Sequence, residues 1–203
     1  MRGALGLSLL LFSGAALSAA GEALAVTPPA KSPAKPSAQP APLKIESEQQ
    51  LFAKLKQCSS AEDAHPIEAK LLSMFRASGS PSVDLLMTRA VTAQGGGDAK
   101  TARQLVEAVT KIAPNYAEGW HVRANMEQGA GDDTAALVSL QRAVLLNPRQ
   151  FTALNELADM LEDYGDKAGA LKLYRRALDL DPQLEGANQK VRELTQSVEG
   201  RDI

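Results

Sequence analysis

Few side chains in this sequence of 203 residues could carry out chemistry, and they form no recognisable catalytic or metal-binding set. The chain has one cysteine, Cys58, and two histidines, His65 and His121. A lone cysteine forms no intramolecular disulfide, and we interpret Cys58 as a small residue buried in a helical segment. Neither histidine lies in an H-E-x-x-H motif or a Cys/His cluster, which zinc sites commonly use. The sequence therefore predicts no metal, no cofactor and no catalytic residue.

The glycine-rich and acidic segments do not fit known ligand loops. The glycines at 95–97 lack the following lysine of a phosphate-binding loop, so we interpret them as a lengthened corner between two helices. The cluster of Glu162, Asp163 and Asp166 lacks the oxygen spacing of a calcium loop and is better explained as a solvated helix end. A formal net charge of −2 predicts no dominant basic face for nucleic acid. We therefore expect a protein that is not an enzyme and does not bind nucleic acid.

A repeat of 34 residues predicts the helices that would position any binding residue. Gly-Asp pairs recur at 97–98, 131–132 and 165–166, and prolines recur at Pro114, Pro148 and Pro182. A fixed period of this length is typical of helix-turn-helix units that stack into a solenoid. Each glycine can end one helix, each aspartate can cap the next, and each proline ends the second helix. The sequence thus predicts an all-α solenoid, an architecture that offers an extended binding surface.

Three blocks aligned on those prolines, at 83–116, 117–150 and 151–184, resemble tetratricopeptide repeats (TPRs). That family places small residues and one aromatic residue at fixed positions of each block, with a proline near its end. The third block fits best, and the first is weaker because Val109 replaces the usual alanine. The matching residues of the third block are Leu154, Leu157, Ala158, Leu161, Gly165, Ala170, Tyr174, Ala177 and Pro182. Stretches at 78–87 and 117–120 also resemble small exported alphaproteobacterial TPR proteins of unknown ligand.

The segments outside the three blocks have different compositions. Residues 1–25 combine Arg2, an apolar run and Ala23-Leu24-Ala25, as in a secretory signal peptide, and the run is short for a membrane span. Residues 26–43 are rich in proline and alanine and predict a disordered linker. Residues 44–82 predict a degenerate helical pair capping the array, and 185–198 a capping helix before a tail at 199–203. We therefore expect a periplasmic or secreted protein with no stable membrane span after signal cleavage, the alternative being a retained signal that anchors it.

The resemblance also implies where a ligand would bind, because the first helix of each TPR lines a concave groove. Carried onto this sequence, the groove residues are Met87, Val91, His121, Asn125, Gln128, Asn155, Asp159 and Glu162. The positions that carry lysine or arginine in the family's carboxylate clamp carry neither here. The resemblance therefore implies a neutral or basic peptide or protein segment as partner. The amides of Asn125 and Asn155 could hold its backbone, although a solvated polar residue explains each of them equally well.

Together these features predict an extracytoplasmic adaptor that binds a peptide or protein segment and aids the assembly of envelope complexes. Two alternatives stay open at this point: a non-catalytic subunit or regulator of an envelope enzyme, and a self-associating structural repeat protein. The sequence also leaves open whether the groove or the convex face binds.

Overall fold

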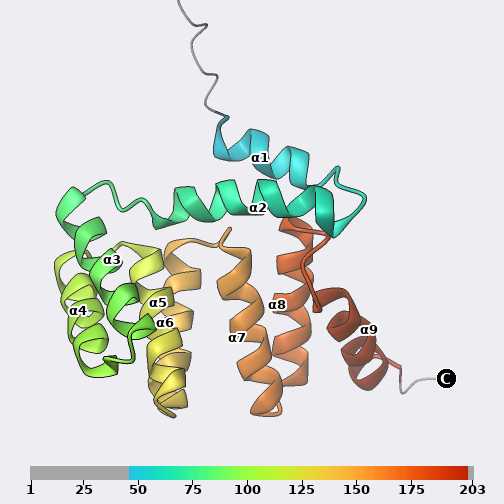
Figure 1. Cartoon of the computed structure of the whole chain (residues 1–203). Helices are drawn as coiled ribbons and strands as arrows, with labels where there is room; N and C mark the ends of the chain where they lie inside the picture. Colours follow the sequence, from blue (N-terminus) through green and yellow to red (C-terminus); the bar gives the residue numbers. More distant parts are fainter. Residues whose placement is uncertain (1–45, 201–203) are drawn as a thin grey trace, which may run out of the picture. The chain divides into compact units, whose positions relative to one another are not determined.

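The computed structural model describes residues 46–200, which belong to one compact unit, Lys44–Ile203. Its regular secondary structure is helical throughout (Figure 1). The signal peptide and linker predicted at 1–43, and residues 201–203 of the tail, lie outside the described residues. The described helices are α1 (Glu48–Leu55), α2 (Ala61–Arg76), α3 (Pro81–Gly95), α4 (Ala99–Ile112), α5 (Ala117–Gly129), α6 (Asp133–Leu146), α7 (Phe151–Asp163), α8 (Lys167–Leu180) and α9 (Ala187–Val198).

The three predicted repeats are three antiparallel helical pairs, α3–α4, α5–α6 and α7–α8, which confirms the all-α solenoid. Their turns follow from the Gly-Asp signal. Gly97, Gly131 and Gly165 adopt φ values of 82°, 77° and 85°, a region that glycine occupies without the penalty of a Cβ. The aspartate after each glycine then accepts a hydrogen bond from a backbone N–H of the next helix, as Asp132 does from Ala135 at 3.1 Å.

Small residues lie where the helices of a pair and of neighbouring repeats pack most closely. Ala124, Ala136, Ala143 and Ala177 are all buried in one cluster between the second and third repeats. Side-chain size at a contact sets how closely two helices approach, so these alanines allow the tight stacking of α5 to α8. The capping helix predicted after the third repeat is present as α9, which packs on α8 with Ala187 and Leu194 buried.

The helical pair predicted at 44–82 corresponds to α1 and α2, and it does not stack side by side with α3. Instead, α2 lies across the ends of the repeat helices, on α5 and on the start of α7 (Figure 1). Phe52 and Phe75 each lie 6.4 Å from Phe151, measured between ring centroids. Leu180 and Leu184 complete this cluster from the end of the third repeat.

The reason for this placement is a difference between the repeats. Phe151 opens its block, whereas the equivalent positions of the other blocks hold Val83 and Ala117. The larger ring provides apolar surface at the start of α7, and burying it favours a helix laid across the end of the repeat. The helical spacing of apolar residues predicts which face of α2 is buried, but it does not predict which part of the protein packs against that face.

Candidate functional site

The predicted groove residues lie on the first helices of the repeats, α3, α5 and α7, but they differ in how far they reach solvent. Val91, Asn125 and Gln128 are exposed, with 55% of Val91 accessible. Equivalent positions of stacked repeats face the same side of a solenoid, so these three side chains are open to a ligand on one surface. The half-buried residues of the prediction are Asn155, Asp159 and Glu162.

Met87 and His121 are buried, which changes the role that the sequence assigned to them. Met87 is 7% exposed and lies in the same apolar cluster as Val83, Ala90 and Met126. Its long, unbranched side chain fills the space between α3 and α5, as methionine often does in irregular cores. Met87 is therefore a core residue that offers little surface to a ligand.

His121 is the centre of a polar network that joins α5 to α7. Its Nδ1 lies 3.1 Å from Glu118 Oε2 and its Nε2 lies 2.8 Å from Glu156 Oε2. Gln150, which is 0% exposed, donates its amide N–H to Glu118 Oε2. The side chain of His121 is only 10% exposed, so both ring nitrogens are committed to protein partners.

The two carboxylates favour the charged, imidazolium form of His121. Burial lowers the pKa of His121, but the hydrogen bonds to Glu118 and Glu156 and the charges of these carboxylates outweigh it and raise the pKa to about 9. An imidazolium whose two N–H groups both face carboxylates has no free lone pair to accept a proton. The structure therefore places His121 as a structural link between the second and third repeats, and gives it no arrangement suited to a general base.

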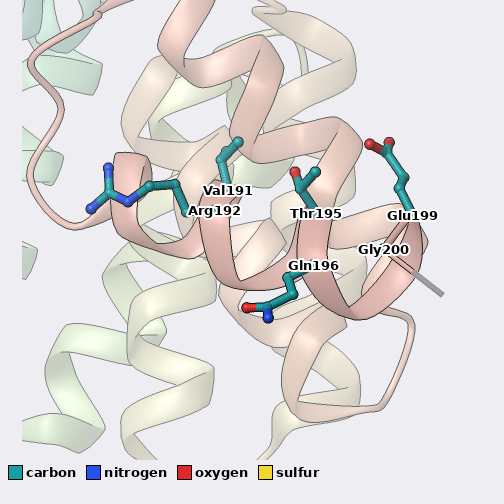
Figure 2. Close-up of a pocket in the computed structure, with 6 residues that line it drawn as sticks. All are labelled: Val191, Arg192, Thr195, Gln196, Glu199 and Gly200. Atoms are coloured by element: carbon teal, nitrogen blue, oxygen red, sulfur yellow. The ribbon is translucent and has the colours of Figure 1, made fainter. Parts of the chain in front are cut away.

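A pocket of about 440 Å³ lies on α9, away from the groove positions. It is lined by Val191, Arg192, Thr195, Gln196, Glu199 and Gly200 (Figure 2). Figure 2 shows that all six lining residues come from α9 and the two residues after it, and none belongs to the predicted groove set. Its lining includes charged and amide side chains, as expected for the solvated end of a repeat array.

A second pocket lies between α7 and α9 and includes two of the predicted groove residues. It encloses about 420 Å³ and is lined by Asn155, Asp159, Tyr174, Glu185, Gly186, Gln189, Lys190 and Glu193. Asn155 and Asp159 occupy groove positions of α7, and α9 stands where the first helix of a following repeat would stand. The pocket therefore lies at the C-terminal end of the predicted groove.

Hydrogen bonds fix the walls of this second pocket. The Tyr174 hydroxyl donates to Asp159 and lies 3.1 Å from Glu162 Oε2, and Asn155 Nδ2 donates to Asp159 Oδ2 at 3.2 Å. Lys190 Nζ lies 3.0 Å from Glu162 Oε2. Asn155 Oδ1 is buried without a partner among the described residues. The Asn155 amide is thus already partly engaged within the protein, unlike the exposed amide of Asn125.

Charge in the pocket is unevenly compensated. Burial raises the pKa of Asp159, while the hydrogen bond to Glu162 raises the pKa of Lys190. The carboxylates of Glu185 and Glu193 reach the same pocket without a close cation among the described ion pairs. The single lysine is shared among several acidic groups, so the pocket favours a neutral or positively charged group over an anion.

Four residues of the His121 network and of the pocket between α7 and α9 were not predicted from the sequence as site residues. Gln150 precedes α7, Glu156 lies one position after a groove position, Tyr174 comes from a second helix and Lys190 from α9. Tyr174 had been assigned only as the packing aromatic of its repeat. A three-residue step from Glu118 to His121 on one helix was the available signal for the first network, since such residues share a helix face.

Among residues 46–200 no cluster of histidine, cysteine and acidic side chains fits a metal ion.

Comparison with known proteins is consistent with this geometry. The family model described as tetratricopeptide repeat matches residues 151–184. No curated protein sequence matches the chain. One similar solved structure is the first TPR of Spaghetti (RPAP3) bound to the HSP90 peptide SRMEEVD, at 19% identity and a TM-score of 0.53, covering 58% of this chain and 93% of that chain.

Two further structures show the same fold at low sequence identity. The Sgt2 TPR domain from Aspergillus fumigatus is 19% identical with a TM-score of 0.52, covering 59% of this chain and 81% of that chain. MamA is 19% identical with a TM-score of 0.53, covering 76% of this chain and 82% of that chain. The tetratricopeptide repeat family is thus supported by the sequence of residues 151–184 and by the fold of the described helices.

Proposed function

We propose that this protein is an adaptor that binds a neutral or basic peptide or protein segment in the groove along α3, α5, α7 and α9. The observation that carries the proposal is the pocket between α7 and α9, where Asp159, Glu185 and Glu193 surround a space of about 420 Å³. A lysine or arginine side chain of a partner would complement these carboxylates. The TPR of Spaghetti is bound to a peptide, which supports the class of function.

The rest of the groove supplies contacts of a different kind. Asn125 and Gln128 on α5 are exposed amides, and each offers both a donor and an acceptor to an extended backbone. Val91 on α3 adds exposed apolar surface at the other end. A segment lying along the groove would therefore meet apolar, then amide, then acidic surface in order from α3 to α9.

We expect the protein to select peptides by charge. When the protein is presented with an array of short random peptides, the bound set should be enriched in lysine and arginine and depleted in aspartate and glutamate. The peptide SRMEEVD should bind roughly 3- to 150-fold more weakly than a version with its three acidic residues replaced by lysine, because each exposed charge pair contributes roughly 0.2–1 kcal/mol. Fluorescence anisotropy at low salt measures this difference.

Two variants locate the charge selection. Glu193→Gln removes a carboxylate of the α7–α9 pocket and should reduce the preference for basic peptides. Asp179→Asn removes an exposed carboxylate of α8 outside the pocket and should leave the preference unchanged. An array that selects acidic peptides, or a preference that responds equally to both variants, would show that this groove is not the binding surface.

We also propose that the adaptor works outside the cytoplasm and helps to assemble envelope complexes, which rests on the signal-like residues 1–25. No helix among residues 46–200 has the length and apolar character needed to cross a membrane. N-terminal sequencing of the exported protein is expected to begin at Val26. Recovery of an uncleaved chain from the membrane fraction would contradict this prediction and indicate an anchored protein.

A further inference from the structure

Lys190 is the only lysine or arginine among the described residues that line the pocket between α7 and α9. It lies on α9, three residues after Ala187 and four before Leu194, and both of these residues are buried in one cluster with Tyr174 of α8. Residues at this spacing share one face of a helix, so Lys190 leaves α9 on the side that packs on the third repeat. The capping helix therefore directs a cationic side chain toward the end of the groove.

The ammonium group of Lys190 is held by α7. Its Nζ lies 3.0 Å from Glu162 Oε2, and the same oxygen lies 3.1 Å from the hydroxyl of Tyr174. The hydrogen bond to Glu162 and the charges of Asp159 and Glu193 raise the pKa of Lys190, which keeps the group charged. The molecule thus already places one lysine side chain at the acidic end of the groove.

The ion pair between Lys190 and Glu162 is accessible to solvent. The side chain of Lys190 is 41% exposed and that of Glu162 is 21% exposed. Exposed pairs contribute little to stability, because water and salt screen them and the lysine loses conformational freedom when it is held. The flexible four-carbon stem of lysine also lets the ammonium group leave without any movement of the α9 backbone. The pair can therefore open when another cation competes for the same carboxylates.

The pocket has the charges to receive such a cation once Lys190 leaves. Asp159, Glu185 and Glu193 all line it, and they attract a lysine or arginine side chain. While Lys190 stays, its ammonium group repels an incoming group of the same charge. Lys190 therefore occupies the position that a cationic side chain of a partner would use.

We propose that Lys190 is a tethered competitor, which occupies the acidic end of the groove in the free protein and swings into solvent when a lysine or arginine side chain of a partner binds there. This inference rests on the proposed function of the groove and names a residue that sets its specificity. Each basic segment must break the pair between Lys190 and Glu162 to bind. Lys190 therefore lowers the affinity for basic segments and leaves the affinity for uncharged segments unchanged.

Fluorescence anisotropy on the full-length chain measures this competition with two peptides that have capped ends. SRMKKVK is a lysine version of SRMEEVD, and SQMQQVN is an uncharged version. Lys190→Gln should bind SRMKKVK about three- to tenfold more tightly than the wild type, because it removes both a competing ion pair and a like charge. Its affinity for SQMQQVN should change by less than about twofold.

Two further variants serve as controls for charge. Lys190→Arg keeps a cation on the same helix position and should bind SRMKKVK within about twofold of the wild type. Lys172→Gln removes the same charge from an exposed position of α8 outside the pocket and should also stay within about twofold. A gain in Lys190→Gln that is no larger than the gain in Lys172→Gln would overturn the proposal.

The cation n-butylammonium tests the pocket without a peptide, because it reproduces the end of a lysine side chain. At constant ionic strength, it should shift the side-chain amide resonance of Asn155 and saturate Lys190→Gln at about three- to tenfold lower concentration than the wild type. This result in a protein that binds neither peptide would support the tethered competitor and contradict the proposed adaptor function.

Equal affinities of the wild type and Lys190→Gln for SRMKKVK and for n-butylammonium would overturn the inference and leave the function of the groove intact. Weaker binding by Lys190→Gln would also overturn it, because this result would show that Lys190 only braces α9. If circular dichroism shows that Lys190→Gln has lost helix, Lys190→Met replaces it with the same expected gain, since methionine keeps an unbranched apolar stem.

Discussion

Phe151→Ala is expected to lower the free energy of unfolding by about 3–5 kcal/mol. Phe151 is 1% exposed and makes an edge-to-face contact with Phe52, at an interplanar angle of 88°. Its ring also packs on Phe75 of α2. Truncation leaves a cavity at the only contact where three aromatic rings of the described residues meet, and nearby helices can close it only partly. Urea unfolding followed by circular dichroism measures the loss.

Ile112→Ala is the matched control, because Ile112 is 64% exposed at the end of α4 and its truncation creates no cavity. Its free energy of unfolding should stay within about 0.5 kcal/mol of the wild type. Equal, small effects of the two substitutions would show that α1–α2 is not anchored on the third repeat.

Raising the pH from about 6.5 to about 9 is expected to lower the free energy of unfolding by on the order of 3 kcal/mol through His121. The folded-state pKa of about 9 lies above the ordinary value of 6.5, so the native state holds a proton that the unfolded chain has released. The stabilisation is therefore complete below about pH 6.5 and is lost as the pH rises through 9. Urea titrations at a series of pH values follow it.

His121→Gln should flatten the stability profile in this range, because the replacement cannot titrate. His65→Gln, which changes an exposed histidine of α2, should keep the fall between about pH 7 and about pH 9. A wild-type profile that is flat over the same range would mean that His121 is not an imidazolium in the folded protein.

The sequence predicted the repeats well because their signals are local. Gly131 permits the turn, Asp132 caps the following helix, and the observed helices α5 and α7 begin at the predicted block starts, Ala117 and Phe151. These residues act on their own backbone, so the pattern and the structure coincide. The placement of α1–α2 depends instead on contacts with residues far away in the sequence. Gln183, for example, donates a hydrogen bond to the carbonyl of Cys58, 125 residues earlier. The periodicity of apolar residues holds no information about such contacts.

Repeat position predicts which residues would line a groove, but it does not predict what surrounds each of them. Repeat position correctly places Asn125 and Gln128 in solvent, because it fixes the direction of a side chain from the helix axis. It does not say what the side chain meets, and His121 meets two carboxylates from two helices. Lys190 reaches the groove from α9, which lies outside the repeats. Side-chain hydrogen-bond networks between helices depend on packing and charge together, and the pattern of a single sequence does not specify them.

The two networks also hold the helices of the predicted groove in fixed positions. His121 ties α5 to α7, and Tyr174 with Lys190 ties α8 and α9 to the acidic side chains of α7. A surface held in this way loses little conformational entropy when a segment binds, which favours affinity from few direct contacts.

The proposed groove is tested most directly by mapping a bound peptide onto the protein with backbone and side-chain amide chemical shifts. A basic peptide selected from the array should shift the side-chain amides of Asn125 and Gln128 and the backbone amides of α7 and α9 that line the pocket with Asp159. Shifts confined to the outward second helices, around Lys172 and Arg176 of α8, would contradict the groove and place binding on the convex face.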